Sequence, residues 1–181
     1  MKSGLLLLLL LCVAPVRADM EVSVCYNYGC NSEARVSFST VQLEKIRDQF
    51  ALAANPERER SILATAAGQL LAWAGQQSPI WRDRAGNYAD DYVQGRMDCI
   101  DHSTTTTRLL HLIEENGWLR FHRVLPPVRR TSFVIGQHFS ANIEEKISGL
   151  RYAVDSWFVE HGQPAVVMPL EEWLAGGGPN V

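Results

Sequence analysis

The sequence lacks several features that would assign a class of function at once. Its 181 residues hold no run of lysine or arginine longer than a pair, and the formal net charge is −3. A basic face that binds the phosphates of a nucleic acid is therefore not expected. Neither a CxxC pair nor an HExxH motif occurs, so we expect no zinc site, and nothing in the sequence implies a cofactor.

Charge is also modest overall, and the chain shows no internal repeat. Charged residues make up 20% and hydrophobic residues 46% of the sequence, which is the balance of a globular protein rather than of a disordered chain. A length of 181 residues is enough for one domain and hardly enough for two.

Long apolar runs are scarce, and the one that exists stands close to the start of the chain. Lys2 precedes an unbroken apolar run from Leu5 to Val13, and Val16-Arg17-Ala18 places small residues before a cut after Ala18. The pattern predicts a signal peptide over residues 1–18, with an uncleaved anchor as the alternative. We expect an exported protein without a stable membrane anchor, periplasmic or secreted after cleavage near Ala18, with a single domain over residues 19–181.

Cysteine is the next scarce residue, since only Cys25, Cys30 and Cys99 remain after that cut. Export implies an oxidising compartment, in which disulfides form. Cys25 and Cys30 bracket the turn-like segment 26–29, so we predict a Cys25–Cys30 disulfide. Cys99 is then unpaired, and an unpaired thiol in an exported protein is either buried and inert or reactive.

The periodicity of apolar residues changes from helical to alternating along the chain. Helical spacing and capping residues predict helices over 41–53, 56–75 and 98–116. Alternation predicts strands over 35–38, 118–125, 132–143, 150–158 and 166–168, with Pro126-Pro127 as a break. Along the chain the predicted helices come first and the predicted antiparallel strands second. This order indicates the α+β class, with N-terminal helices packed on a C-terminal antiparallel sheet.

Cys99 stands at the predicted start of a helix. Asp98 is suited to be the N-cap, and Asp101, three residues on, is suited to complete a capping box. A cysteine in the first turn faces the positive end of the helix dipole, which favours the thiolate. A nucleophile also needs a base and a group that orients the base.

His138 and Asp155 are the candidates for those two roles. His138 lies on one predicted strand, and Asp155 lies among apolar residues of the next, where a carboxylate needs a partner. A hairpin loop over 144–149 would pair residue 143 with residue 150 and place His138 opposite Asp155, within side-chain reach. The three residues then form a Cys-His-Asp triad. The alternative is a core thiol, a surface histidine and a buried ion pair.

Other residues compete for a role at this site. His102 follows Cys99 by three residues on the same predicted helix and is the second candidate for the base. We expect surface or loop positions for three further histidines, and packing roles for three tryptophans: His111, His122 and His161, and Trp118, Trp157 and Trp173.

Two short motifs resemble those of papain-like cysteine peptidases, and more closely those of their transglutaminase-like branch. Asp155-Ser156-Trp157 is similar to the papain Asn-Ser-Trp, with the aspartate typical of transglutaminase-like members. Residues 98–101, Asp-Cys-Ile-Asp, resemble the Asp-Cys-x-Asp around the nucleophile of bacterial transglutaminase-like peptidases. The resemblance covers about residues 94–160. It implies a papain-like fold and a thiol hydrolase or acyltransferase that works through a thioester.

The resemblance also implies an oxyanion-hole glutamine shortly before the nucleophile, for which Gln94 is the candidate. Three functions stay open. The first is an exported peptidase or amidase acting on a peptide or protein substrate. The second is an acyltransferase that uses the same triad with an amine acceptor. The third is a non-catalytic binding or accessory module, with an envelope protein as the candidate partner and residues 26–28 as a recognition edge.

Overall fold

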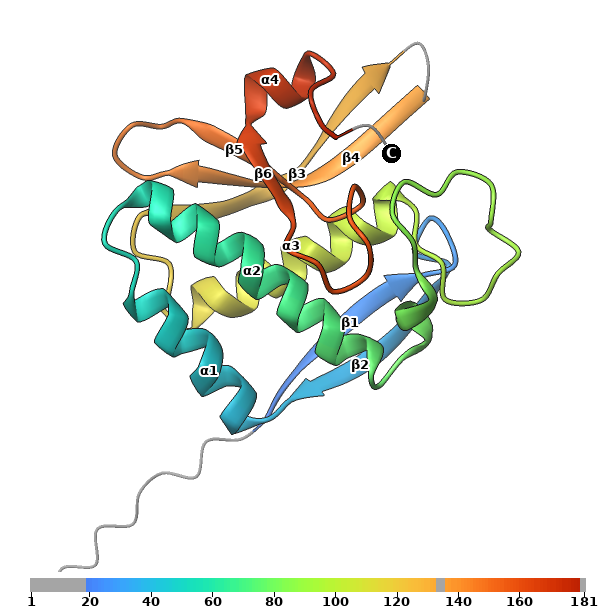
Figure 1. The fold of residues 1–181 in the computed structure, drawn as a ribbon, viewed down its shortest axis with the longest axis horizontal. Helices are drawn as coiled ribbons and strands as arrows, with labels where there is room; N and C mark the ends of the chain where they lie inside the picture. Colours follow the sequence, from blue (N-terminus) through green and yellow to red (C-terminus); the bar gives the residue numbers. More distant parts are fainter. Residues whose placement is uncertain (1–18, 133–135, 180–181) are drawn as a thin grey trace, which may run out of the picture.

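The computed structural model describes residues 19–132 and 136–179, and the predicted signal peptide lies outside them. Within these ranges the protein belongs to the α+β class, with two antiparallel sheets and four α-helices (Figure 1). In chain order the elements are β1 (Met20–Tyr26), β2 (Ser32–Phe38), α1 (Thr40–Ala51), α2 (Pro56–Gly75), the 3₁₀ turn η1 (Pro79–Arg82), α3 (Cys99–Glu115), β3 (His122–Ser132), β4 (Gly136–Glu145), β5 (Arg151–Asp155), β6 (Val166–Pro169) and α4 (Leu170–Leu174).

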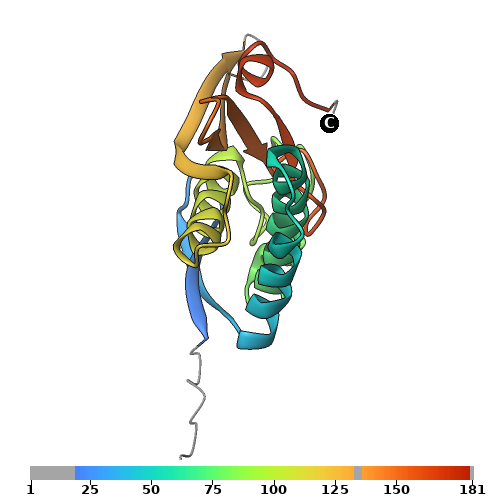
Figure 2. The ribbon, with the colours of Figure 1, turned by 90° about the vertical axis from the view of Figure 1, so that its left-hand side faces the viewer.

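Helix α3 occupies the centre of the fold. It contacts β1 on one side, α2 on another, and β3, β4 and β5 of the larger sheet. Figure 2 shows α1 and α2 on one side of the molecule and α3 with β1 on the other, with the four-stranded sheet at one end. The start of α3 lies between the turn of the β1–β2 hairpin and strand β4.

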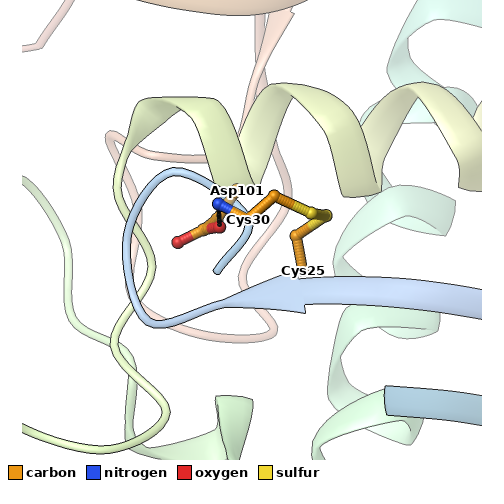
Figure 3. A group of neighbouring side chains, drawn as sticks. All are labelled: Cys25, Cys30 and Asp101. Carbon is orange, nitrogen blue, oxygen red and sulfur yellow. Dashed lines mark hydrogen bonds between the residues drawn. A yellow bond between two sulfur atoms is a disulfide. The ribbon is translucent and has the colours of Figure 1, made fainter. Parts of the chain in front are cut away.

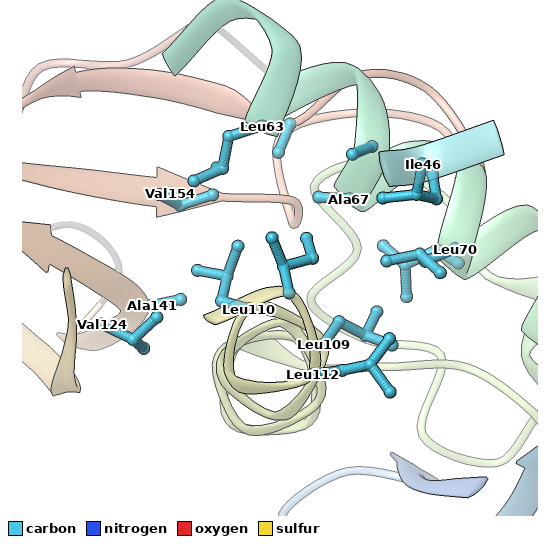
Figure 4. Packing of buried hydrophobic residues seen from close by; sticks show 14 of the residues in the cluster. Ile46, Leu63, Ala67, Leu70, Leu109, Leu110, Leu112, Val124, Ala141 and Val154 are labelled. Carbon is cyan, nitrogen blue, oxygen red and sulfur yellow. The ribbon is translucent and has the colours of Figure 1, made fainter. Parts of the chain in front are cut away.

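The main hydrophobic core fills the space between these helices and the inner face of the sheet. In Figure 4, Leu110 of α3 lies toward Leu63 of α2 and Val154 of the sheet, and Leu109 of α3 lies toward Leu70 of α2. All five are buried. Residues 105–107 of α3 are threonines, which form helices poorly, and their burial shows that packing holds this part of the helix.

The N-terminal hairpin corrects the expectation of a single short strand over 35–38. β1 pairs with β2 along its whole length, from Met20 opposite Phe38 to Tyr26 opposite Ser32, and the two strands form a sheet of their own. The predicted Cys25–Cys30 disulfide is confirmed and closes the turn of this hairpin.

The four-stranded sheet has the order β3-β4-β5-β6, so each strand lies beside its neighbour in sequence. The predicted break at Pro126-Pro127 is wrong. β3 continues through both prolines, because a shift of register between Leu125 and Val128 accommodates residues that lack an N–H. β5 ends at Asp155 rather than at Phe158. No helix in the described ranges has the length and apolar character needed to cross a membrane.

Candidate active site at the start of helix α3

The start of α3 is capped as the sequence predicts. Asp98 is the N-cap, and its Oδ1 accepts hydrogen bonds from the backbone N–H groups of Ile100 and Asp101, at 3.0 and 2.9 Å. The Asp101 side chain accepts in turn from the Asp98 N–H, which completes the capping box. Cys99 is therefore held in the first turn of the helix.

The disulfide-closed turn of the β1–β2 hairpin docks on this same helix end. Four consecutive residues, 27–30, adopt left-handed backbone angles, with φ between 57° and 67°, and only one of them is glycine. Such a conformation is costly for the other three and needs outside support. The support comes from the two aspartates of the cap: Asp98 accepts from the Gly29 N–H at 3.0 Å, and Asp101 accepts from the Tyr28 and Cys30 N–H groups at 2.8 and 2.6 Å.

Figure 3 shows Cys25, Cys30 and Asp101 gathered at this junction, and in the described ranges these three are the one group close enough to hold a metal ion. Both sulfurs are used by the disulfide, and the Asp101 carboxylate accepts three backbone N–H groups. The cluster therefore connects the hairpin turn to the start of α3 and is not a set of metal ligands. Burial and the nearby Asp98 carboxylate raise the pKa of Asp101 to about 7.

Cys99 lies half-buried on the wall of a small cavity of about 140 Å³. Its thiol lies 3.9 Å from the backbone oxygen of Gln137, and the Phe139 N–H points at the sulfur from the same strand. The residues that line the cavity come from the hairpin turn, the loop before α3, the helix start and the sheet: Tyr28, Asn87, Tyr88, Asp98, Cys99, Gln137, His138 and Trp157.

The environment of Cys99 favours the thiol over the thiolate. Burial, with smaller contributions from the carboxylates of Asp98 and Asp155, raises the pKa of Cys99 to about 11, although the Phe139 N–H acts in the opposite direction. The sequence led us to expect that the helix terminus favours the thiolate. In the structure the effect of burial is larger, so the helix terminus does not by itself produce a resting thiolate. A base that removes the proton is needed for any reaction of this sulfur.

His138 and Asp155 form the contact that the sequence predicts. His138 Nε2 lies 2.7 Å from Asp155 Oδ2, and each side chain is only 1 to 2% exposed. An ionised carboxylate only accepts hydrogen bonds, so Nε2 carries the proton and Nδ1 is the basic nitrogen. Asp155 Oδ1 accepts from the Trp157 N–H at 3.2 Å, which fixes the carboxylate from the other side.

The register that creates this contact differs from the predicted one by two residues. Ile143 pairs with Tyr152 rather than with residue 150, so the position opposite Asp155 along the ladder is Ser140, and His138 lies diagonally across from it. A shift of two leaves each side chain on its original face, because side chains alternate with period two. Diagonal neighbours are within reach of a long side chain such as histidine.

His102, the rival base, lies away from the cavity in a second buried network. Its Nε2 contacts Asp83 Oδ2 and its Nδ1 contacts Ser156 Oγ, each at 2.8 Å, and Ser156 Oγ also contacts Thr106 Oγ1 at 2.9 Å. Although burial opposes protonation, the Asp83 carboxylate raises the pKa of His102 above its ordinary value. His102, Asp83 and Ser156 are all buried, and none of them lines the cavity.

Two other predictions about side chains need correction. His122 is completely buried rather than on the surface, and its Nδ1 lies 2.9 Å from Glu59 Oε1. His161 is half-buried, whereas His111 is on the surface as predicted. Gln94 is exposed on the loop before α3 and is not among the residues that line the cavity, so the structure does not bring it to Cys99.

The sequence does not mark Asn87, Tyr88 or Gln137 as cavity residues. Tyr28, the fourth residue not predicted to line the cavity, does carry a signal, which is its place between the two cysteines of the disulfide. No protein-family model, curated protein or solved structure matches this chain.

Proposed function

We propose that the protein is an exported thiol hydrolase, a peptidase or amidase of papain-like or transglutaminase-like type, acting on a peptide or protein substrate. Cys99 is the nucleophile, His138 the base and Asp155 the group that orients the base. The observation that carries the proposal is the buried His138–Asp155 pair, joined at 2.7 Å, in which His138 lines the same cavity as a free cysteine at a helix start.

In this reaction the Cys99 sulfur attacks the substrate carbonyl carbon while its proton passes to His138 Nδ1. The proton transfer accompanies the attack, because a thiol with a pKa of about 11 is not ionised beforehand. The C–S bond forms and the C–N bond breaks, and His138 gives the proton to the departing amine. Water, deprotonated by His138, then cleaves the thioester and returns the thiol.

The negative charge that develops on the substrate oxygen needs donors that are already in place. Gln94 does not supply one, but the backbone N–H groups of Cys99 and Phe139 both point at the sulfur and lower its pKa. They support an oxyanion hole made of main-chain donors, one from the start of α3 and one from β4.

An acyltransferase would use the same residues, and it differs only in whether an amine or water attacks the thioester. A binding module is favoured by one observation: the Cys99 thiol is turned to the Gln137 oxygen and is half-buried. For a hydrolase, the thiol has to turn from that oxygen to His138 Nδ1 when substrate binds. Free enzymes often show such loose geometry before binding.

The test is to trap the acyl-enzyme. The purified chain is mixed with p-nitrophenyl acetate, an acyl donor small enough for the cavity, and its intact mass is followed with time. We expect one acetyl group on Cys99 that hydroxylamine removes, none in Cys99→Ser, and at least about a hundredfold slower acylation in His138→Ala. His111→Ala, at a half-exposed histidine outside the cavity, is the matched control. Equal acylation in His138→Ala and the control would overturn the proposal in favour of a binding module.

Hydrolase and transferase are then separated by adding amines to the acetylated protein. Loss of the acetyl group in buffer alone identifies the hydrolase. Loss only after an amine is added, with the acetyl group appearing on that amine, identifies the transferase.

A further inference from the structure

Helix α4, close to the end of the described chain, places a buried tryptophan against the His138–Asp155 pair. We infer that Trp173 is a positioning residue for the proposed reaction, in which its indole N–H holds the Asp155 carboxylate that orients His138. This inference rests on the proposed function and adds a fourth side chain to the triad.

The contact is direct. Trp173 Nε1 donates to Asp155 Oδ2 at 2.9 Å, and this is the same oxygen that accepts from His138 Nε2 at 2.7 Å. The Trp173 ring also lies beside the His138 ring, with centroids 5.5 Å apart and planes inclined by 33°. The tryptophan therefore touches both members of the pair, and its own side chain is completely buried.

Trp173 is fixed in turn by Arg130, from the strand next to His138. Arg130 is the cross-strand partner of His138 in the β3–β4 ladder. Its Nη1 donates to the backbone oxygens of Trp173 and Gly177, and its guanidinium lies over the Trp173 ring, 4.6 Å from the centroid. The indole is thus held between a buried cation and the histidine, and a cation over the ring makes its N–H a stronger donor.

Packing alone does not require this arrangement. A buried indole N–H needs some acceptor, and a backbone oxygen would satisfy it. Here the acceptor is the buried carboxylate, and its two oxygens receive donors from three places: His138, Trp173 and the Trp157 backbone. These donors share the charge of the Asp155 carboxylate and limit how strongly it attracts the imidazole proton.

A specific consequence follows for the titration of His138. Without the indole N–H, the Asp155 carboxylate has one donor fewer to share its charge and attracts the protonated imidazole more strongly, so His138 should protonate at higher pH. The other titratable groups around the pair are Cys99 and His102 of α3, Arg130 of β3 and Tyr88 of the loop before α3. All four residues are retained in Trp173→Phe, and the phenylalanine still offers a ring to the Arg130 guanidinium.

The experiment compares Trp173→Phe with Trp118→Phe in the full chain. Both substitutions replace a buried tryptophan by a smaller ring, and Trp118 belongs to the main core rather than to the cluster around Trp173. The titration midpoint of His138 is followed by NMR, and acylation by p-nitrophenyl acetate is measured at neutral pH. We expect Trp173→Phe to raise the midpoint by about half a pH unit or more and to slow acylation about tenfold, with neither change in Trp118→Phe.

The two ways to fail are distinct. An unchanged His138 midpoint in Trp173→Phe, in a wild type that does form the acyl-enzyme, overturns the role of Trp173 alone. A wild type that forms no acyl-enzyme overturns the proposed function, and the role given to Trp173 in it falls as well.

Discussion

Asp155 and Ser156 are neighbours in the chain, and each binds a different buried histidine. Asp155 Oδ2 lies 2.7 Å from His138 Nε2, and Ser156 Oγ lies 2.8 Å from His102 Nδ1. The cavity at Cys99 reaches His138 but not His102. The end of β5 is therefore fixed by two networks, and the one around His102 holds the segment on which the proposed catalytic carboxylate lies.

Replacing His102 by glutamine should lower stability in a pH-dependent way. The pKa of His102 is raised in the folded protein, chiefly because Asp83 outweighs the effect of burial, so its contribution is complete below the unfolded value of 6.5 and is lost as pH rises through the folded pKa. We expect His102→Gln to cost about 2 kcal/mol of unfolding free energy at pH 5.5 and clearly less at pH 9, as measured by urea denaturation.

The control is His111→Gln, which changes a half-exposed histidine on the same helix. It should alter the unfolding free energy by no more than about 0.5 kcal/mol at either pH. If His102→Gln were equally destabilising at both pH values, the charged His102–Asp83 pair would be the wrong account of this network.

The disulfide should matter both for stability and for the proposed site. Replacing Cys25 and Cys30 together by serine opens a loop of a few residues, which costs about 2 kcal/mol in the unfolded-chain account of disulfides. The left-handed turn also loses its closure, and Tyr28, which lines the cavity, is then held by its hydrogen bonds with Asp101, Asp90 and Asn31. We therefore expect slower acylation of Cys99 as well as a lower urea midpoint. An acylation rate equal to that of the wild type would show that the turn does not shape the site.

Gln94 offers a test of the oxyanion hole. Because Gln94 is exposed and outside the cavity, Gln94→Ala should leave the rate of Cys99 acylation within about twofold of the wild type. Loss of a true oxyanion donor costs on the order of a hundredfold or more. A loss of that size would mean that Gln94 moves to the site when substrate binds, and the main-chain donors proposed from Cys99 and Phe139 would then be incomplete.

Much of the fold was predictable from local signals. The three long helices follow from apolar spacing and from caps such as Asn55 and Asp98, whose side chains bond the first turns as expected. The β1–β2 hairpin was not predictable in full. Its turn places Asn27, Tyr28 and Cys30 in left-handed conformations, and Asp98 and Asp101, which stabilise this turn, lie far along the chain.

The site was predictable where it depends on alternation along strands and not where it depends on packing between distant elements. The predicted hairpin register was wrong by two residues, yet the contact of His138 with Asp155 survives because an even shift keeps the face. The hydrogen bonds of His102 with Asp83 and of Trp173 with Asp155 could not be predicted. In each pair the two residues come from elements that are distant in the sequence and meet only through packing. Gln94 was predicted to lie at the oxyanion hole because it stands a few residues before Cys99. It lies on a loop, and distance along the chain does not determine the path of a loop.

The most direct test of the central claim, that His138 activates Cys99, is the rate of Cys99 alkylation by iodoacetamide between pH 5 and 10. The wild type, His138→Ala and the control His111→Ala are compared in the folded state. We predict that the wild type and the control are alkylated readily at neutral pH, because His138 takes the proton as the sulfur reacts. We predict that His138→Ala reacts only as the pH rises toward about 11, the pKa that burial and the neighbouring carboxylates give the Cys99 thiol. Identical profiles for all three proteins, rising only in the alkaline range, would contradict the account and leave Cys99 a buried thiol without a base.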